Sequence, residues 1–299
     1  MLASSLLRSR LVSPRRHNLS TEKLTYFSAW FCPFAHRTTL ALAHHGKEYV
    51  DYDWVEALGW ETRKASGQEK FDAAEREEWQ YHWKHPDLLS RNPEGMIPTL
   101  ASGDRVATES VPCLELIDSL ARAKGSPKRL VPEDPWVAAH VRVWAEKINK
   151  TSCSEYYKCL VRESKDERSD AFDRLVAGLE AFTDTIPAGK GPFFSGLEEP
   201  SLVDFVLLPY AFRFYVLAHY RDFHLPQNPT YDKWLSACLT LPGIHETLPD
   251  KDRYLKHIDK YASGKARSKV ANAVRRGANA HDYDHTLDTE KLQLPHNTT

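Results

Sequence analysis

The first part of the chain alternates short runs of β-forming residues with a helical pattern of apolar positions. Residues 23–28 and 48–54 predict strands, and residues 33–45 between them predict a helix. Pro33 suits the first helical position, and Gly46 is a natural helix stop. This order forms a βαβ unit, which predicts a sheet that is at least partly parallel.

Two further strands and a helix complete this unit. Residues 97–100 and 105–107 predict short strands on either side of a turn that contains Gly103. Residues 111–123 carry apolar side chains at helical spacing and predict an amphipathic helix. Prolines punctuate residues 125–135, which is typical of a linker between domains.

The pattern from Trp136 onward is helical. Helices are predicted over residues 137–159, 166–185, 201–218, 231–239 and 252–261. Ser201 and Asp204 have the spacing of a capping box, with Asp in place of the usual Glu, before an apolar run. We therefore predict an α/β domain over residues 23–124, a linker over 125–135 and an all-helical domain over 136–262.

Three segments fall outside this plan. Residues 57–85 are charged and rich in tryptophan, and we predict an insertion with a short helix over 72–83. Residues 1–22 are basic, with no acid before Glu22, which is typical of a mitochondrial transit peptide or of a disordered arm on a cytoplasmic protein. Residues 263–299 form a basic extension with a short helix, which faces solvent, contacts the body or binds anionic partners.

Composition narrows the function classes. The 299 residues are 41% hydrophobic and 27% charged, with a formal net charge of -1, so we expect no general attraction to nucleic acid or to anionic membranes. We see no run of about 18 apolar residues and expect no membrane span. Five cysteines without a CxxC pair argue against a disulfide framework and a zinc knuckle. His82 and His85 have the spacing of a metal clip but lack neighbouring ligands, so we expect no metal.

Cys32 stands at the predicted junction of a strand and a helix. The start of a helix carries partial positive charge and unpaired N–H groups, which stabilise a thiolate. We therefore expect a reactive Cys32 with a pKa below the ordinary value of about 8.5, the alternative being an inert buried thiol. Ala35 stands where a dithiol motif would carry its second cysteine. A mixed disulfide at Cys32 would therefore need an external thiol to resolve it. The other four cysteines lie in apolar helical patterns and are predicted to be core residues.

Three motifs together resemble the omega-class glutathione transferases. They are FCPFAHR at residues 31–37, NPEGMIPTL at 92–100 and TESVPCLELI at 108–117. The resemblance covers roughly residues 23–260, and the extension beyond is similar to that of C-terminally extended fungal members. It implies the glutathione transferase fold: a thioredoxin-like βαβ-ββα domain followed by an all-helical domain.

The resemblance also implies that glutathione is the cosubstrate. Glu109 would pair with its ammonium group, and Ser110 with the following helix start would take the γ-glutamyl carboxylate. Ile97 would present backbone groups to the cysteinyl part, before a Pro98 expected to be cis. Phe34 would lie beside the thiol.

The remaining contacts are less sharply implied. Lys84 or His85 would meet the glycyl carboxylate of glutathione. The second substrate, a small electrophile or a disulfide, would rest against the helical domain. Candidate lining residues there are Trp144, Tyr156, Tyr157 and Arg213, although aromatic residues at helical spacing are also typical of a core.

The implied activity is thiol transfer and dehydroascorbate-type reduction through a glutathionylated Cys32. Conventional glutathione conjugation is an alternative. The motif at residues 33–37 also resembles glutathionyl-hydroquinone reductases, with Phe34 where they usually carry Trp. A catalytically silent glutathione-binding module is an alternative of another class. Members of the family commonly form homodimers, and we expect one here.

Overall fold

The computed structural model describes residues 23–64 and 78–281. The predicted transit peptide or arm at 1–22, the first part of the predicted 72–83 helix and the end of the extension lie outside the described residues.

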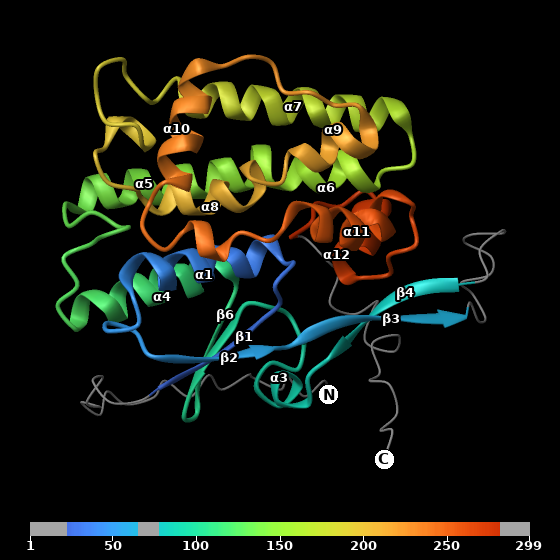
Figure 1. Cartoon of the computed structure of the whole chain (residues 1–299), viewed down its shortest axis with the longest axis horizontal. Helices are drawn as coiled ribbons and strands as arrows, with labels where there is room; N and C mark the ends of the chain where they lie inside the picture. Colours follow the sequence, from blue (N-terminus) through green and yellow to red (C-terminus); the bar gives the residue numbers. More distant parts are fainter. Residues whose placement is uncertain (1–22, 65–77, 282–299) are drawn as a thin grey trace, which may run out of the picture.

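A four-stranded mixed sheet forms the first layer of the molecule. Its strand order is β2-β1-β5-β6, with β1 and β2 parallel and the other pairs antiparallel. The strands are β1 (Leu24–Ser28), β2 (Tyr52–Glu56), β5 (Thr99–Ser102) and β6 (Arg105–Thr108). Helices α1 (Pro33–His45) and α4 (Ser110–Ala123) lie on the face of the sheet that is turned toward the helical domain (Figure 1). The predicted βαβ-ββα order is confirmed.

The second strand starts later than predicted. Gly46 ends α1 with a φ of 94°, and its carbonyl accepts hydrogen bonds from the backbone N–H groups of Tyr49 and Val50. The turn that these bonds close uses residues that the sequence pattern placed in a strand, so β2 begins only at Tyr52.

The insertion contains a β-hairpin that projects beyond the main sheet (Figure 1). It pairs β3 (Leu58–Lys64) with β4 (Glu78–Lys84) in antiparallel register. The helix predicted over 72–83 is therefore wrong for its described part. Trp79 and Tyr81 are buried while Gln80 between them is half-exposed, so this segment follows a period of two, which a strand satisfies and a helix does not. A short helix, α3 (Pro86–Arg91), follows and was not predicted.

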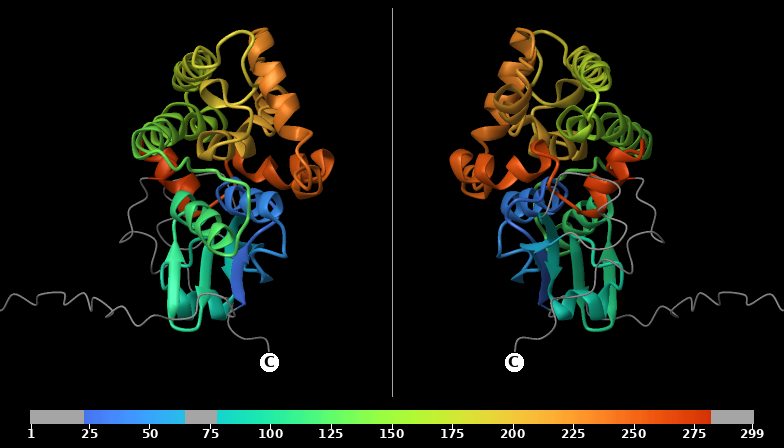
Figure 2. Two further views of the ribbon diagram at one scale, coloured as in Figure 1. Left: turned by 90° about the vertical axis from the view of Figure 1, so that its left-hand side faces the viewer. Right: turned by 90° about the vertical axis from the view of Figure 1, so that its right-hand side faces the viewer.

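Helices pack above the sheet in a second layer (Figures 1 and 2). They are α5 (Pro135–Ile148), α6 (Ser154–Val161), α7 (Lys165–Thr183), α8 (Leu202–Ala211), α9 (Tyr215–Arg221), α10 (Pro229–Leu239) and α11 (Lys251–Ala262). A π-helical turn at Asn149–Cys153 interrupts the predicted 137–159 helix. A turn at residues 212–214 likewise divides the predicted 201–218 helix.

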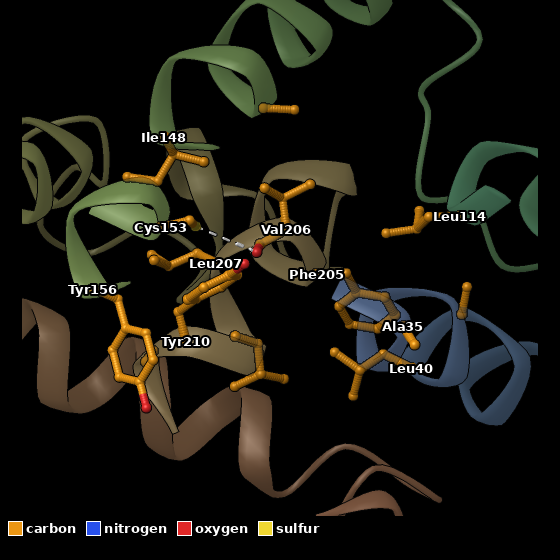
Figure 3. Packing of buried hydrophobic residues seen from close by; sticks show 14 of the residues in the cluster. Ala35, Leu40, Leu114, Ile148, Cys153, Tyr156, Phe205, Val206, Leu207 and Tyr210 are labelled. Carbon is orange, nitrogen blue, oxygen red and sulfur yellow. Dashed lines mark hydrogen bonds between the residues drawn. The ribbon is translucent and has the colours of Figure 1, made fainter. Parts of the chain in front are cut away.

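Helix α8 is the buried axis of the molecule. Every residue of α8 is buried, and its side chains meet those of α1 in the core between the two layers (Figure 3). The predicted capping box is confirmed: Asp204 accepts from Ser201 N and Oγ, both at 2.7 Å. Asp204 also accepts from Phe194 N at 3.0 Å and Trp234 Nε1 at 2.8 Å. One carboxylate therefore caps α8 and ties two other segments, at Phe194 and Trp234, to its start.

The stretch Leu202–Arg221 is, by length and composition alone, long and apolar enough to cross a membrane. Its most apolar window is 78% buried inside the protein. The stretch comprises α8 and α9, and its apolar surface is covered by the rest of the fold, as in the core helix of a globular domain.

The end of the chain returns to the cleft between the two layers. Helices α11 and α12 (Lys269–Arg275) lie beside α6 and above the hairpin (Figure 1). Gln80 of β4 donates to Lys265 O at 3.0 Å, and Arg267 N donates back to Gln80 O at 2.8 Å. Of the three alternatives for the basic extension, contact with the body is the one seen for its described part, residues 263–281.

Candidate functional site

Cys32 is the N-cap residue of α1, at the turn that leads from β1 into the helix. Its Sγ accepts a hydrogen bond from Ala35 N at 3.5 Å, and Pro33 follows at the first helical position. The predicted placement at a helix start is thus confirmed. The other four cysteines are buried, as predicted.

The thiol of Cys32 does not have the lowered pKa that its position predicts. Burial raises the pKa of Cys32, against the lowering influence of the Ala35 and Phe34 N–H groups and of the Arg213 and Arg37 guanidinium groups. The expectation of a lowered pKa is wrong for this conformation. The physical cause is desolvation: Cys32 is half-buried in a cavity that α11 and α12 cover, and the loss of water around the sulfur penalises the thiolate.

Cys32 faces a cavity of about 50 Å³. Its floor comes from the α/β domain, with Phe34, Lys84 and Ile97. Its roof comes from α6, α11 and α12, and includes Tyr157, Tyr254, His257, Tyr261, Lys269 and Val270. The floor carries the predicted glutathione-binding residues, whereas most of the roof was not predicted.

A second cavity of about 30 Å³ lies next to the first and contains Pro98, Glu109 and Ser110. Phe34 and Ile97 line both cavities. The Ile97–Pro98 peptide bond is cis, as expected. The structure therefore brings all the predicted glutathione-binding residues to two adjoining cavities.

The turn before α4 has an uncommon backbone. Glu109 is the N-cap residue of α4 and adopts a φ of 69°, a left-handed conformation that is rare for residues other than glycine. Strain of this kind persists where the surrounding structure fixes it, and it concentrates at binding sites. The N–H groups of the first turn of α4 and the carboxylate of Glu109 thereby meet at one end of the site.

Arg37 anchors the Ser110 end of the site. Its role there was not predicted from the sequence. Its Nη1 donates to Ser110 Oγ at 2.9 Å, its Nε to Val206 O at 3.1 Å and its Nη2 to Asn149 Oδ1 at 2.8 Å. The residue is 1% exposed, so this buried cation links α1 with α4, α8 and the π-helical turn. The only sequence signal was its place in the FCPFAHR motif.

Two lysines converge at the opposite end. Lys84 Nζ donates to Glu94 O at 2.9 Å, and Lys269 Nζ of α12 reaches the same oxygen at 3.3 Å. Both side chains are buried and both line the Cys32 cavity. His85, the alternative to Lys84, instead caps α3 by accepting from Asp87 N at 3.2 Å.

The roof over Cys32 is aromatic. Tyr157 stacks on Phe34 with ring centroids 6.3 Å apart, and Tyr261 bonds Ser268 Oγ at 2.9 Å. Burial lowers the pKa of His82 to about 3 and that of His257 to about 2, so both rings are neutral near pH 7. The cavity therefore presents phenol groups and neutral rings to whatever approaches the thiol.

Three of the four candidate lining residues on the helical domain lie elsewhere. Trp144 packs on Phe194, with ring centroids 5.5 Å apart. Tyr156 is fully buried in the core (Figure 3). Arg213 is buried too, where it donates to His36 Nδ1 at 3.1 Å. Of the four, only Tyr157 lines the Cys32 cavity, because residues at helical spacing mostly face the core that α8 provides.

Within residues 23–64 and 78–281, no group of three or more His, Cys, Asp or Glu side chains is arranged to hold a metal ion. The polar groups that do converge are N–H groups and lysines, which donate hydrogen bonds, and the Glu109 carboxylate, which accepts them; such a set suits a zwitterionic organic ligand.

The fold and this arrangement define a thiol site on a two-layer transferase scaffold. The "Glutathione S-transferase, N-terminal domain" model matches residues 31–120, and the "Glutathione S-transferase, C-terminal domain" model matches residues 129–237. Together they cover more than half of the chain. The protein therefore belongs to the glutathione S-transferase family, and its predicted fold class is confirmed.

Two relatives with curated descriptions come from one plant, Arabidopsis thaliana. Glutathione S-transferase U19 of Arabidopsis thaliana is 25% identical over 209 residues, which cover 69% of this chain and 91% of that protein. Glutathione S-transferase U27 of the same plant is 28% identical over 188 residues, covering 60% of this chain and 81% of the relative.

Solved structures with the same fold include two classes. Glutathione transferase Omega 3C from Trametes versicolor has a TM-score of 0.64 at 20% identity, over 84% of this chain and 94% of that one. A Tau class enzyme from mango has a TM-score of 0.62 at 19% identity, over 80% and 99%. These comparisons establish the family but not the omega class.

Proposed function

We propose that this protein is a glutathione-dependent thiol transferase and reductase of omega type, with Cys32 as its nucleophile. The observation that carries the proposal is the position of Cys32, which is a lone cysteine at the N-cap of α1. It shares a pair of adjoining cavities with the cis Ile97–Pro98 bond and the Glu109–Ser110 turn. A serine or tyrosine there would favour activation of glutathione's own thiol instead.

The cycle has two exchange steps. In the first, the Cys32 thiolate attacks the glutathionyl sulfur of a mixed disulfide, and the S–S bond breaks to release the substrate as a thiolate that takes up a proton. In the second, the thiolate of another glutathione attacks the Cys32–glutathione disulfide, releasing oxidised glutathione and restoring Cys32. Electrons balance, because one free glutathione thiol is consumed and one substrate thiol is released: the substrate disulfide is replaced by the disulfide of oxidised glutathione, whose second half comes from the substrate.

Glutathione lies across the floor of both cavities in this proposal. Its ammonium pairs with Glu109, and its γ-glutamyl carboxylate meets Ser110 and the N–H groups that begin α4. Ile97 pairs with the cysteinyl backbone, and Lys84 receives the glycyl carboxylate. Phe34 packs beside the peptide.

A two-assay comparison tests this activity. Purified protein is assayed for glutathione-dependent reduction of bis(2-hydroxyethyl) disulfide and for conjugation of 1-chloro-2,4-dinitrobenzene. We expect reduction to dominate and Cys32→Ser to abolish it. The matched control is Cys159→Ser, at a buried cysteine outside both cavities, which should keep the activity. Conjugation without reduction would favour the conventional transferase, and neither activity would favour a silent module.

A second candidate is reduction of glutathionylated hydroquinones. The aromatic roof favours it, because Tyr157, Tyr254 and Tyr261 line the Cys32 cavity and offer both stacking surfaces and phenol groups to an aromatic substrate. The test compares turnover of glutathionyl-hydroquinone with that of the aliphatic mixed disulfide. Preference for the aromatic substrate that is lost in Tyr157→Leu would select this candidate.

We also infer that the protein forms a homodimer. Trp136 and Val143 on α5 are 85% and 65% exposed, and Val106 on β6 is 40% exposed, so apolar side chains lie on the outer surface of both layers. Light scattering of the purified protein and of Trp136→Glu would test this. A monomer in both cases would refute it.

Residues 1–20 direct the protein to mitochondria in this proposal. Imaging a fluorescent fusion with and without these residues tests it, and identical cytoplasmic signals would refute it.

A further inference from the structure

We propose that residues 265–281, the last described part of the chain, are an inhibitory strap that occupies the glutathione site and must move away before glutathione binds. The proposal rests on the glutathione site described above. It goes further by assigning a regulatory role to a segment that the family models do not cover, since their second match ends at residue 237.

The two cavities are too small for the tripeptide. Small-molecule sites in proteins measure about 300–1,000 Å³. The Cys32 cavity and the Ser110 cavity measure only about 50 and 30 Å³. One water molecule takes up about 30 Å³ of liquid. The closed site thus holds a few waters at most.

The strap supplies the side chains that fill the missing space. Ser268, Lys269 and Val270 line the Cys32 cavity. Val270, Ala280 and His281 line the cavity that contains Glu109 and Ser110. Val270 thus stands against both cavities, between the thiol and the γ-glutamyl end of the proposed site. A glutathione that joined Cys32 to Ser110 along the floor of Phe34 and Ile97 would compete with the Val270 side chain for the same space.

The strap is held mainly by polar contacts, which water can replace when the strap moves away. It pairs with Gln80 of β4 through two backbone hydrogen bonds. The Arg267 guanidinium lies 3.4 Å from the centre of the Trp79 ring, and His281 Nδ1 lies 2.8 Å from Ser154 Oγ. The buried apolar side chains of α12 are small, namely Ala271, Ala273 and Val274. Such an attachment is strong enough to populate a closed state and weak enough to release.

The closed position of the strap also explains why the pKa of the Cys32 thiol is raised. Ala35 N and the start of α1 favour a thiolate, yet burial raises the pKa of Cys32 in the closed structure. Residues of the strap and of α11 line the cavity that the sulfur faces, so they stand between Cys32 and the solvent. Removing the strap would return water to the sulfur, so one movement would open the binding site and activate the nucleophile together.

A disulfide that locks the strap onto the hairpin tests the proposal. Gln80 and Ala266 are bridge partners, and paired strand positions lie at separations that a disulfide can span. The variant is Gln80→Cys with Ala266→Cys. The matched control is Thr62→Cys with Gln80→Cys, a register pair within the hairpin that leaves the strap untouched.

The first readout is the rate at which N-ethylmaleimide labels Cys32, followed by peptide mass spectrometry without any thiol present. We expect the oxidised Gln80–Ala266 lock to slow labelling at least tenfold relative to the oxidised control, and reduction to restore the rate. The second readout is calorimetric binding of S-methylglutathione, which cannot reduce the lock. Binding should be lost in the oxidised lock and kept in the control.

Equal labelling and equal binding in the two oxidised variants would refute the proposal that the strap closes the site. If the lock does not form, Val270→Gly offers the opposite test, because a smaller side chain at the point shared by both cavities should speed labelling, and an unchanged rate would count against the proposal. Labelling needs no enzymatic activity. A gated thiol in a protein without reductase activity would therefore refute the proposed function and leave the strap standing.

Discussion

The site has two walls that are built in different ways. The wall from the α/β domain rests on β1, α1, the cis Ile97–Pro98 bond and the start of α4, and its two helices pack against the fully buried α8. The wall from residues 265–281 rests on α12, which is held by backbone pairing, one cation–ring contact, a few polar bonds and the packing of small side chains such as Ala271 and Val274. The first wall holds the chemistry, and the second covers it.

This difference shows which wall of the site is rigid and which wall can move away. The first wall shares its anchors with the core, because Arg37 ties Ser110 to α8 and Asp204 ties α8 to two other segments. Disturbing them disturbs the fold. The second wall adds only small apolar side chains to the core, namely Ala266, Ala271, Val274 and Ala280, so its departure would cost less apolar burial than loss of the first wall. Substitutions in the two walls should therefore separate stability from accessibility.

The largest expected effect is on the stability of the first wall. Asp204→Ala removes the acceptor of the Ser201, Phe194 and Trp234 N–H groups, and each orphaned buried donor costs about 1–3 kcal/mol. We expect the free energy of unfolding in urea to fall by at least about 3 kcal/mol. Asp232→Ala on the exposed surface of α10 is the control and should stay within about 0.5 kcal/mol of the parent. Similar losses in both variants would contradict the anchoring role.

The next effect is on ligand affinity at unchanged stability. Glu109→Gln removes the proposed partner of the glutathione ammonium, and a hydrogen bond to a charged group is worth about 1.5–3 kcal/mol. The dissociation constant for S-methylglutathione should therefore rise by roughly 10- to 100-fold in calorimetry. Glu115→Gln is the control, since Glu115 also belongs to α4 but pairs on the surface with Arg142 of α5. An unchanged constant in Glu109→Gln would remove this residue from the site.

The first wall could largely be predicted from the sequence because its chemistry is local. A cysteine before a proline at a strand end, an Ile–Pro pair and a Glu–Ser turn each fix a short backbone geometry. All of them appear in the structure at those positions. The capping box at Ser201 and Asp204 was predictable for the same reason.

The second wall could not be predicted because it depends on contacts between distant segments. Lys269 reaches Glu94 O across the cleft, and Ala266 pairs with Gln80 across more than half of the chain. No periodicity encodes such pairings. The pKa of Cys32 was mispredicted for the same cause, since a helix start predicts a lower value and only the assembled cover shows that burial prevails.

The comparison predicts a smaller effect on the pH dependence of labelling. Burial raises the pKa of Cys32 in the closed state, so the closed state holds its proton more tightly than an open one. Labelling should therefore rise with pH through a midpoint above the ordinary thiol value of about 8.5. Val270→Gly should move that midpoint to lower pH, because it lets water reach the sulfur.

Other groups near the cavity have to be separated from this profile. His82 and His257 are neutral throughout the range, with pKa values of about 3 and about 2. Burial lowers the pKa of Lys260 to about 8, so it titrates within the range, and Lys260→Gln should be run as the control. A midpoint that follows Lys260→Gln rather than Val270→Gly would assign the pH dependence to the lysine.

The smallest expected effect comes from a single fastening of the strap. Arg267→Ala removes the guanidinium that lies over Trp79, a contact worth about 0.5–2 kcal/mol. Labelling of Cys32 should then accelerate roughly 2- to 30-fold if closure limits access, while the urea midpoint barely changes because the core is untouched. Arg276→Ala is the matched control, an exposed arginine directly after α12. A drop in stability without faster labelling would mean that Arg267 belongs to the fold rather than to the strap, and the division between the two walls would fail at this residue.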